Sequence, residues 1–271
     1  MSLPCTTAEL VDRASELARG PRRILGIVGA PGAGKSTLAE LLVAELDGAA
    51  VCVPMDGFHL EDSLLRRLGR RGRKGAIDTF DDAGYAALMQ RLAAQPGSVP
   101  FQSGSSSSQP GSASSPSGSV SSPPSSISPP PGSIPPLPGS TPSMEEPDLA
   151  GHGVYDGGRA GETVYAPWFD RDAENTLGSA VPILPDVPLV ITEGNYLLAD
   201  CGAWPRARAV MNEVWFLDPP DEVRHQRLVA RHRSFGKSEQ EARDWTYGTD
   251  ERNAAMIAST AGGADLILRW V

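Results

Sequence analysis

The segment "GAPGAGKST", residues 29–37, places glycines, a lysine and two hydroxyl residues in the pattern G-x-x-x-x-G-K-[ST]. Glycines let the backbone bend so that successive N–H groups point at phosphate oxygens, and the helix that follows adds its positive end. Lys35 is expected to reach the β- and γ-phosphates of ATP, and the Ser36 hydroxyl to bind Mg²⁺. The sequence therefore predicts an ATP–Mg²⁺ site. Its expected nucleotide-binding residues are Gly29, Gly32, Ala33, Gly34, Lys35, Ser36 and Thr37.

Two acidic residues stand at the ends of apolar segments, where parallel α/β sheets bind their ligands. Glu193 ends "PLVITE", and an acid at that place in a phosphate-loop protein holds the Mg²⁺ shell. Asp56 ends "VCVPMD", and its carboxylate could take the proton of an attacking hydroxyl. Asp-Gly is also common turn chemistry, so position alone leaves Asp56 open between a base and a turn residue. His59 is a candidate substrate contact or a solvated loop residue.

The segment "RHQRLVARHR", residues 224–233, concentrates arginines. Arg227 and Arg231 are four residues apart, so they share one face of the helix expected here. Arginines on such a helix can close over a triphosphate and steady charge in the transition state, although they could also form an ordinary solvated face. Because acidic residues are sparse after Glu222, we favour the first role. Arg231 is then a catalytic candidate and Arg227 a nucleotide-binding one.

Elements that could position these residues alternate along the chain. We expect strands at 22–29, 49–56, 187–194, 213–220 and 264–268. We expect helices at 35–46, 81–94, 220–232 and 238–260, and an N-terminal helix at 6–20 whose Thr6 and Glu9 fit a capping box. Continuous apolar strands alternating with helices predict an α/β fold, namely a P-loop NTPase-type parallel sheet with helices on both faces.

Residues 98–147 are nearly all Ser, Pro and Gly, a composition that cannot bury enough apolar surface to offset its ordering entropy. We expect a disordered insert within one P-loop kinase domain formed by residues 1–97 and 148–271, because neither part alone carries a complete sheet. Long insertions cost little, since closure entropy grows only with the logarithm of loop length. The "PP" motifs leave two roles open: docking of Pro-recognising modules, or a tolerated surface insertion.

Composition restricts the partners. The 271 residues carry a formal net charge of -9, which disfavours broad binding to nucleic acid. No segment approaches the roughly 20 apolar residues that a membrane span requires, and the N-terminal residues are too acidic for a secretory signal. The three cysteines form no CxxC pair, which favours a reducing compartment, and we expect a cytoplasmic protein. A homodimer is compatible with these features.

Several motifs, in this order, resemble the phosphoribulokinase/uridine kinase/pantothenate kinase family of P-loop kinases. After "GAPGAGKST", the segment "MDGFH" is similar to the Asp-Gly-Phe stretch of bacterial pantothenate kinases, and "RKGAIDTFD" resembles another of their segments. "VYAPWFDRDAEN" resembles the substrate segment of uridine kinases, "ITEGNYLL" their Glu-Gly strand end, and "RHQRLVARH" their arginine lid. Together these motifs cover most of the chain outside residues 98–160.

The resemblance implies a role for each matching residue. Asp56 would be the base that activates the acceptor hydroxyl, and Glu193 would assist Mg²⁺. The substrate-binding residues would be His59, Tyr165, Arg171 and Asn195, and the lid would carry Arg227 and Arg231. Two departures leave the acceptor open between a nucleoside, a pantothenate-like compound and a sugar. "KGAIDTFD" lacks the proline and glutamate of pantothenate kinases, and "EGNYLL" has Asn195-Tyr196 where uridine kinases have small apolar residues.

Three function classes follow. The first is an ATP-dependent kinase that transfers the γ-phosphoryl group to a hydroxyl of a small metabolite. The second is a P-loop NTPase switch, although the guanine-specifying Asn-Lys-x-Asp is absent from the sequence. The third is a nucleotide-binding regulatory protein without small-molecule transfer. The presence of Lys35, Ser36, Asp56 and Glu193 together favours the kinase.

Overall fold

The computed structural model describes residues 3–94, 162–171 and 173–270. These residues belong to one compact unit, Met1–Gln102 with Arg159–Val271. The insert predicted at residues 98–147 lies outside the described residues, so that expectation and the domain boundaries built on it stay predictions.

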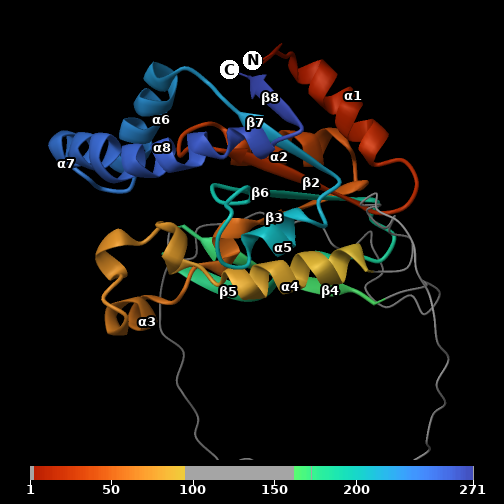
Figure 1. The fold of residues 1–271 in the computed structure, drawn as a ribbon, viewed down its shortest axis with the longest axis horizontal. Helices are drawn as coiled ribbons and strands as arrows, with labels where there is room; N and C mark the ends of the chain where they lie inside the picture. The colour runs from red at the N-terminus through yellow and green to blue at the C-terminus, as the bar shows by residue number, and fades with distance from the viewer. Residues whose placement is uncertain (1–2, 95–161, 172, 271) are drawn as a thin grey trace, which may run out of the picture. The chain divides into compact units, whose positions relative to one another are not determined.

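The core of this unit is a parallel sheet with the strand order β1-β8-β7-β2-β6-β3 (Figure 1). Five of its strands fall on the five apolar segments of the sequence, and the short β1 joins at the edge. Since all pairings are parallel, the carboxyl ends of neighbouring strands meet at one edge. The prediction of an α/β parallel sheet is confirmed. The strands are β1 (Leu3–Pro4), β2 (Arg23–Gly29), β3 (Ala50–Pro54), β6 (Leu189–Gly194), β7 (Glu213–Leu217) and β8 (Leu266–Arg269).

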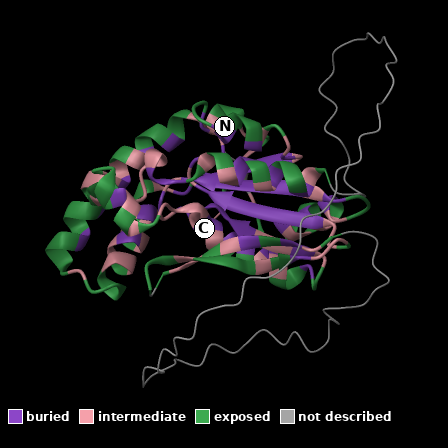
Figure 2. Ribbon diagram, turned by 90° about the horizontal axis from the view of Figure 1, so that it is seen from below, coloured by how far each residue is buried: buried purple, intermediate pink, exposed green. Residues whose placement is uncertain are grey.

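Helices cover both faces of this sheet, as the sequence predicts. Side chains alternate across a strand, so β2 sends Leu25 and Ile27 to one face and Ile24 and Val28 to the other. The first face packs on α1 (Thr7–Leu17) and α2 (Lys35–Glu45), and the second on α4 (Asp82–Ala93) and α5 (Trp204–Arg208). Figure 2 shows the strands of the sheet buried between these layers. The buried central strands therefore fix the positions of the residues at their ends.

The N-terminal helix begins as the sequence predicts. Thr6 accepts a hydrogen bond from the backbone N–H of Glu9, and the Glu9 side chain bonds back to the Thr6 backbone. This capping box satisfies two N–H groups that a helix start leaves free. Leu10, Ala14 and Leu17 are the buried residues of the helix, so it packs on the sheet by one face.

An antiparallel pair of strands, which the sequence analysis did not predict, lies within residues 164–183. Strand β4 (Val164–Asp170) pairs with β5 (Asn175–Ile183), with an irregularity in register between Ala166 and Trp168. The pair lies against the turn η1 (Met55–Phe58). A Cβ on Gly57 would approach the Pro167 carbonyl oxygen to 2.5 Å. Strand β4 is thereby held beside η1, which directly follows β3.

The C-terminal helices differ from the single helix predicted at 238–260. After α6 (Asp221–Ser234), the chain forms α7 (Glu239–Trp245), a π-helical turn η5 (Thr246–Asp250) and α8 (Glu251–Ser259). The prediction of one regular helix was wrong in its middle. A π turn inserts an extra residue and changes which side chains share a face, and such turns are frequent at functional sites. Figure 1 shows α6, α7 and α8 grouped beyond one end of the sheet.

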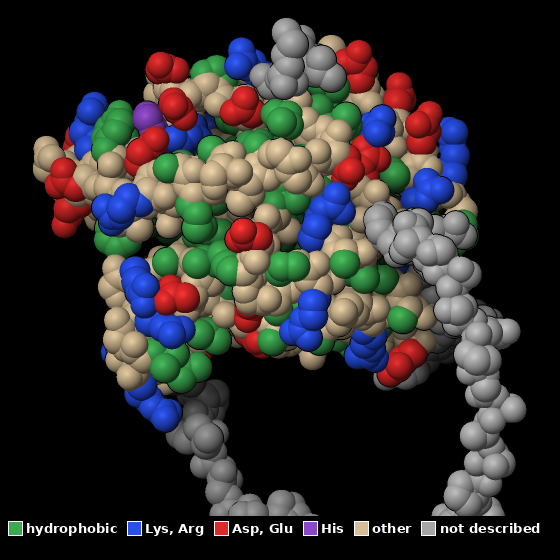
Figure 3. Space-filling view, in the orientation of Figure 1, with side chains coloured by type: hydrophobic (Ala, Val, Ile, Leu, Met, Phe, Trp, Pro, Cys, Tyr) green, Lys and Arg blue, Asp and Glu red, His purple; other side chains and the backbone are tan. Residues whose placement is uncertain are grey.

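Short helices complete the described chain: α3 (Asp62–Arg67), η2 (Arg71–Arg73), η3 (Ile77–Thr79) and η6 (Ala261–Gly263). In the described segments, no helix combines the length and apolar character needed to cross a membrane. On the face shown in Figure 3, acidic and basic side chains are interspersed.

Candidate active site

The phosphate loop connects the buried strand β2 with helix α2. Gly32 and Gly34 have φ angles of 80° and 96°, a region that glycine adopts without strain. A Cβ on Gly32 would lie 2.7 Å from the Arg224 carbonyl oxygen and 2.9 Å from Leu228 Cγ, so this loop runs directly against α6. Gly34 is the residue before α2, whose first backbone N–H groups face the loop. The sequence has folded into a backbone cradle at the positive end of a helix.

The side chains of Lys35, Ser36 and Glu193 lie close together beside this cradle. The Ser36 hydroxyl donates to Glu193 Oε1 at 3.1 Å, and Lys35 Nζ donates to the Ala30 carbonyl oxygen at 3.2 Å. Burial lowers the pKa of Lys35 to about 8, opposed by the nearby Glu193 and Asp56 carboxylates. Burial, with the charge of Asp56, raises the pKa of Glu193, while Lys35 pulls it back. Removing these charged groups from water is costly, and cationic and anionic ligands would relieve the cost.

Asp56 stands on η1, immediately after β3. Its Oδ2 accepts a hydrogen bond from Arg171 Nη2 at 3.1 Å, and Arg171 comes from the β4–β5 turn. The Asp56 side chain is 29% exposed, so its carboxylate is open to the site. Arg171 therefore orients the Asp56 carboxylate through a hydrogen bond from the β4–β5 turn.

His59 is held beside Asp56 by its ring. Nδ1 lies 2.8 Å from the Asp56 carbonyl oxygen, which can only accept, so Nδ1 carries the proton. The ring centroid lies 4.1 Å from that of Phe80 and 4.8 Å from that of Phe169. Burial lowers the pKa of His59, so the imidazole is neutral at pH 7. Its Nε2 is then a hydrogen-bond acceptor, with no partner in the described part of the chain.

These residues line a single cleft of about 380 Å³. The cleft joins the phosphate loop, the ends of β3 and β6, the β4–β5 turn and helices α6 to α8. Eight residues selected from the sequence line it together: Lys35, Ser36, Asp56, His59, Arg171, Glu193, Asn195 and Arg231. Residues that are far apart in the sequence therefore form one site.

The other selected residues lie around the cleft. Gly29, Ala33 and Thr37 stand in the phosphate loop or the first turn of α2, with Ala33 buried and Thr37 exposed. Tyr165, by contrast, is 51% exposed on β4 and is not among the described residues that line the cleft. We do not include Tyr165 in the proposed acceptor site.

Arg227 supplies the observation that best fits a phosphate ligand. Its Nη1 is buried, and no hydrogen-bond partner for it exists among the described residues. The same atom would lie 3.3 Å from a Cβ on Gly34, so it faces the phosphate loop. A buried donor left without an acceptor costs roughly 1–3 kcal/mol, and a phosphate oxygen at the loop would satisfy it. Arg231, one turn further along α6, lines the cleft.

Sequence reasoning did not select several residues of the cleft. Lys74 donates to Asp62 Oδ1 at 2.8 Å and lies over the Phe169 ring. Asp250, on the π turn, accepts from His232 Nε2 at 2.7 Å. The basic run at 70–74 was the available signal for Lys74, and nothing local marked Asp250. The further lining residues are Pro31, Arg71, Gly75, Phe80, Phe169, Glu174, Gly194, His232, Phe235, Lys237, Trp245, Thr249 and Asn253.

Comparisons with known proteins find relatives that are named as kinases. No protein-family model matches the chain. The chain is 38% identical over 77 residues to the "ATP-dependent kinase-like protein notR'" of Aspergillus versicolor, a match that spans 28% of this chain and 45% of that relative. It is 24% identical to a "putative uridine kinase" of Schizosaccharomyces pombe, over 96% of this chain and 89% of the relative.

A solved structure extends the comparison to the fold. The crystal structure of a "putative fructose transport system kinase" from Silicibacter sp. superposes with a TM-score of 0.67 at 27% identity, covering 98% of this chain and 100% of that one. The chain is similar, over nearly its whole length, to proteins named as kinases, including a putative uridine kinase. The family resemblance found in the sequence motifs is thus confirmed. Similarity to P-loop kinases implies nucleotide binding, and the phosphate loop is where this chain would hold the nucleotide.

Proposed function

We propose that this P-loop kinase transfers the γ-phosphoryl group of ATP to a hydroxyl of a small metabolite, with Mg²⁺. The observation that carries the proposal is the position of Asp56. Its carboxylate lines the same cleft as Lys35, Ser36 and Glu193, the groups that we assign to binding of the phosphate donor. A switch protein positions a water molecule against the donor, whereas a kinase places a proton acceptor for the hydroxyl of a second substrate.

The donor half follows from the phosphate loop. The backbone N–H groups around Gly32 and Gly34 and the guanidinium of Arg227 would bind phosphate oxygens, and Lys35 would neutralise charge on the transferring group. Ser36 and Glu193 already share a hydrogen bond, and they would hold Mg²⁺, which offsets phosphate charge when bound. Arg231 would add a positive charge opposite Lys35, where negative charge develops.

The acceptor half is built around Asp56. As the acceptor oxygen forms its bond to phosphorus and the bond to ADP breaks, the hydroxyl proton passes to the Asp56 carboxylate. Arg171 holds that carboxylate in orientation, and the free Nε2 of His59 accepts a hydrogen bond from a second donor on the acceptor. An acceptor with at least two hydroxyl or N–H groups suits this pair, which includes nucleosides, sugars and pantothenate-like compounds.

The helical side of the cleft would exclude water. Phe235, Lys237 and Trp245 line it, and Lys237 Nζ lies 4.9 Å from the centre of the Trp245 ring. Exclusion of water favours transfer to the acceptor over hydrolysis, because water is the competing nucleophile.

The test is Asp56→Asn, with Asp47→Asn as the matched control on an exposed residue at the end of α2. ATP affinity and phosphoryl transfer to a panel of nucleosides, sugars and pantothenate are measured on the same preparations. We expect Asp56→Asn to bind ATP within about threefold of wild type while transfer falls about 10²-fold, the usual scale for a general base. The control should match wild type in both.

Each other outcome rejects part of this account. Unchanged transfer by Asp56→Asn would exclude Asp56 as the base. Loss of ATP binding would make it a metal-shell or structural residue. ATP hydrolysis by wild type that no acceptor stimulates would favour a switch or a regulatory protein over a kinase.

A further inference from the structure

Helix α6 lies against the phosphate loop through Arg224. Besides the contact of its carbonyl oxygen with Gly32, Arg224 Cγ would lie 3.0 Å from a Cβ at that glycine. The side chain of Arg224 is only 3% exposed. Arg224, Arg227 and Arg231 are spaced by three and four residues, so they lie along one side of the helix. The position of Arg224 therefore affects the positions of Arg227 and Arg231, the two arginines that are proposed to face the phosphates.

The Arg224 guanidinium makes polar contacts with three separate elements. It donates to Asp221 Oδ1 at the start of α6, with Nη2 at 3.0 Å, and to Glu251 Oε2 at the start of α8, with Nη2 at 2.7 Å. Its Nη1 lies 3.4 Å from the carbonyl oxygen of Pro31 in the phosphate loop. A planar guanidinium can serve several acceptors in fixed directions, which a lysine ammonium on a flexible stem cannot reproduce.

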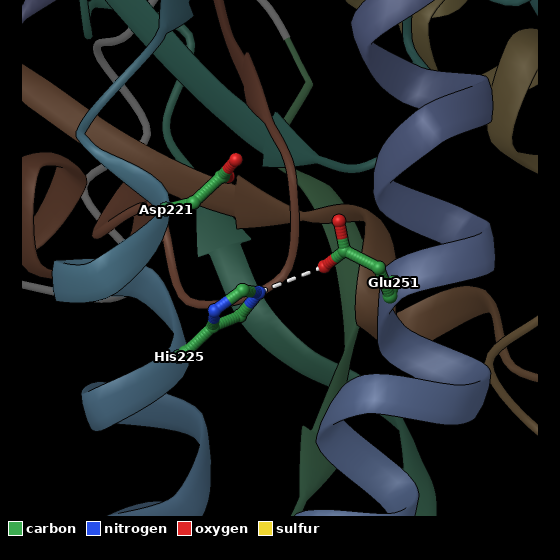
Figure 4. A group of neighbouring side chains, drawn as sticks. All are labelled: Asp221, His225 and Glu251. Atoms are coloured by element: carbon green, nitrogen blue, oxygen red, sulfur yellow. Dashed lines mark hydrogen bonds and ion pairs between the residues drawn. The ribbon is translucent and has the colours of Figure 1, made fainter.

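Asp221, His225 and Glu251 form a compact group whose ligand atoms lie within 4.8 Å of one another (Figure 4). Such a set could hold a divalent metal ion, but Arg224 donates to both carboxylates and already supplies the positive charge there. His225 Nε2 lies 2.9 Å from Glu251 Oε2, and these hydrogen bonds lower the pKa of Glu251. The group is therefore better explained as the anionic half of an ion-pair network than as a metal site.

We propose that Arg224 is a positioning residue for phosphate binding: it fixes α6 against the phosphate loop so that Arg227 and Arg231 face the triphosphate. Asp221 and Glu251 hold the guanidinium in place from the starts of α6 and α8. The assignment rests on the proposed function in one respect, that the ligand at Arg227 is a phosphate of ATP. Arg224 itself touches the loop backbone and does not bind the phosphates.

The decisive experiment is a double-mutant cycle of Arg224→Lys and Arg227→Ala, read by ATP affinity in the presence of Mg²⁺. Arg233→Lys is the matched control, since Arg233 lies on the same helix and is 60% exposed. If Arg224 acts through Arg227, we expect Arg224→Lys to weaken ATP binding about tenfold in the wild-type background and less than about twofold in Arg227→Ala. Arg233→Lys should leave the affinity unchanged.

Equal weakening in both backgrounds overturns the proposal, because a general loss of structure acts independently of Arg227. Glu251→Gln guards against a variant that fails to fold, since Glu251 is 41% exposed and the change keeps its shape. It should weaken ATP binding about threefold, again only when Arg227 is present. Saturable Zn²⁺ binding to wild type that His225→Ala abolishes would also overturn the proposal in favour of a metal site.

Turnover measured on the same preparations separates this inference from the proposed function. A wild type that binds ATP but transfers no phosphoryl group contradicts the kinase, while the binding cycle still decides the role of Arg224. A wild type that does not bind ATP overturns both.

Discussion

The buried ammonium of Lys35 makes nucleotide binding depend on pH. Burial lowers its pKa to about 8, so the free enzyme loses this positive charge as pH rises through 8. A bound triphosphate favours the protonated form, because an opposite charge raises the pKa of an amine. The sign is therefore fixed: ATP affinity falls with rising pH, and binding near pH 8 takes up a proton.

The magnitude follows from the fraction of free enzyme that is protonated. With a pKa of about 8, that fraction is about 90% at pH 7, half at pH 8 and about 10% at pH 9. ATP affinity should then weaken roughly tenfold between pH 7 and pH 9, with uptake of about half a proton at pH 8. Terminal phosphates lose their last proton near pH 6, so the nucleotide itself contributes little over this range.

Isothermal titration calorimetry in two buffers of different ionisation enthalpy measures both quantities. Lys35→Arg is the control, because arginine stays protonated across the range and its affinity, although lower, should not change with pH. The charged groups facing Lys35 are Glu193, Asp56, Arg231 and Arg171. A wild-type affinity that is flat from pH 7 to 9, without proton uptake, would refute the reasoning.

Three further predictions address the acceptor site, the loop and the insert. His59→Phe keeps the ring between Phe80 and Phe169 but removes its acceptor nitrogen, so the KM for the acceptor should rise about tenfold with ATP affinity unchanged. Gly32→Ala should lower the free energy of unfolding by about 1–3 kcal/mol more than Gly48→Ala in urea titrations. Both glycines have a φ of 80°, but nothing lies within 4 Å of a Cβ on Gly48. Deleting residues 103–143 should preserve solubility and basal turnover, and loss of either would show that the segment is structural.

The sheet could be predicted because its strands are continuous apolar segments, which parallel strands covered on both faces require. The β4–β5 pair could not. Eight of the nine residues of β5 are at least partly exposed, Ile183 alone being buried, so no alternation marks the strand. Strand β4 contains Pro167, which argues against an interior strand in sequence reasoning. Its pairing depends on contacts with η1, which are far away in the sequence.

The residues of the site also divide into those that could be predicted from the sequence and those that could not. Asp56 could be selected because it follows a recognisable strand, and Glu193 because it lies near the end of one. Asp250 could not, since it enters the cleft through a π turn inside a segment with helical periodicity. Its burial beside His232 is a tertiary contact between η5 and α6, and no local pattern encodes it. Lys74 likewise lines the cleft while it is bonded to Asp62 and to the Glu174 carbonyl oxygen, two contacts that no local pattern encodes.

The two halves of the cleft are built from different kinds of element, core elements in one half and an exposed turn in the other, and this difference affects specificity for the acceptor. Lys35 and Glu193, in the proposed donor half, are buried at the ends of core elements, where most substitutions would disturb packing. In the proposed acceptor half, Arg171 and the lining residue Glu174 lie on the β4–β5 turn, with side chains 46% and 65% exposed. Changes on such a turn cost little stability, so acceptor preference can diverge while the nucleotide site is kept.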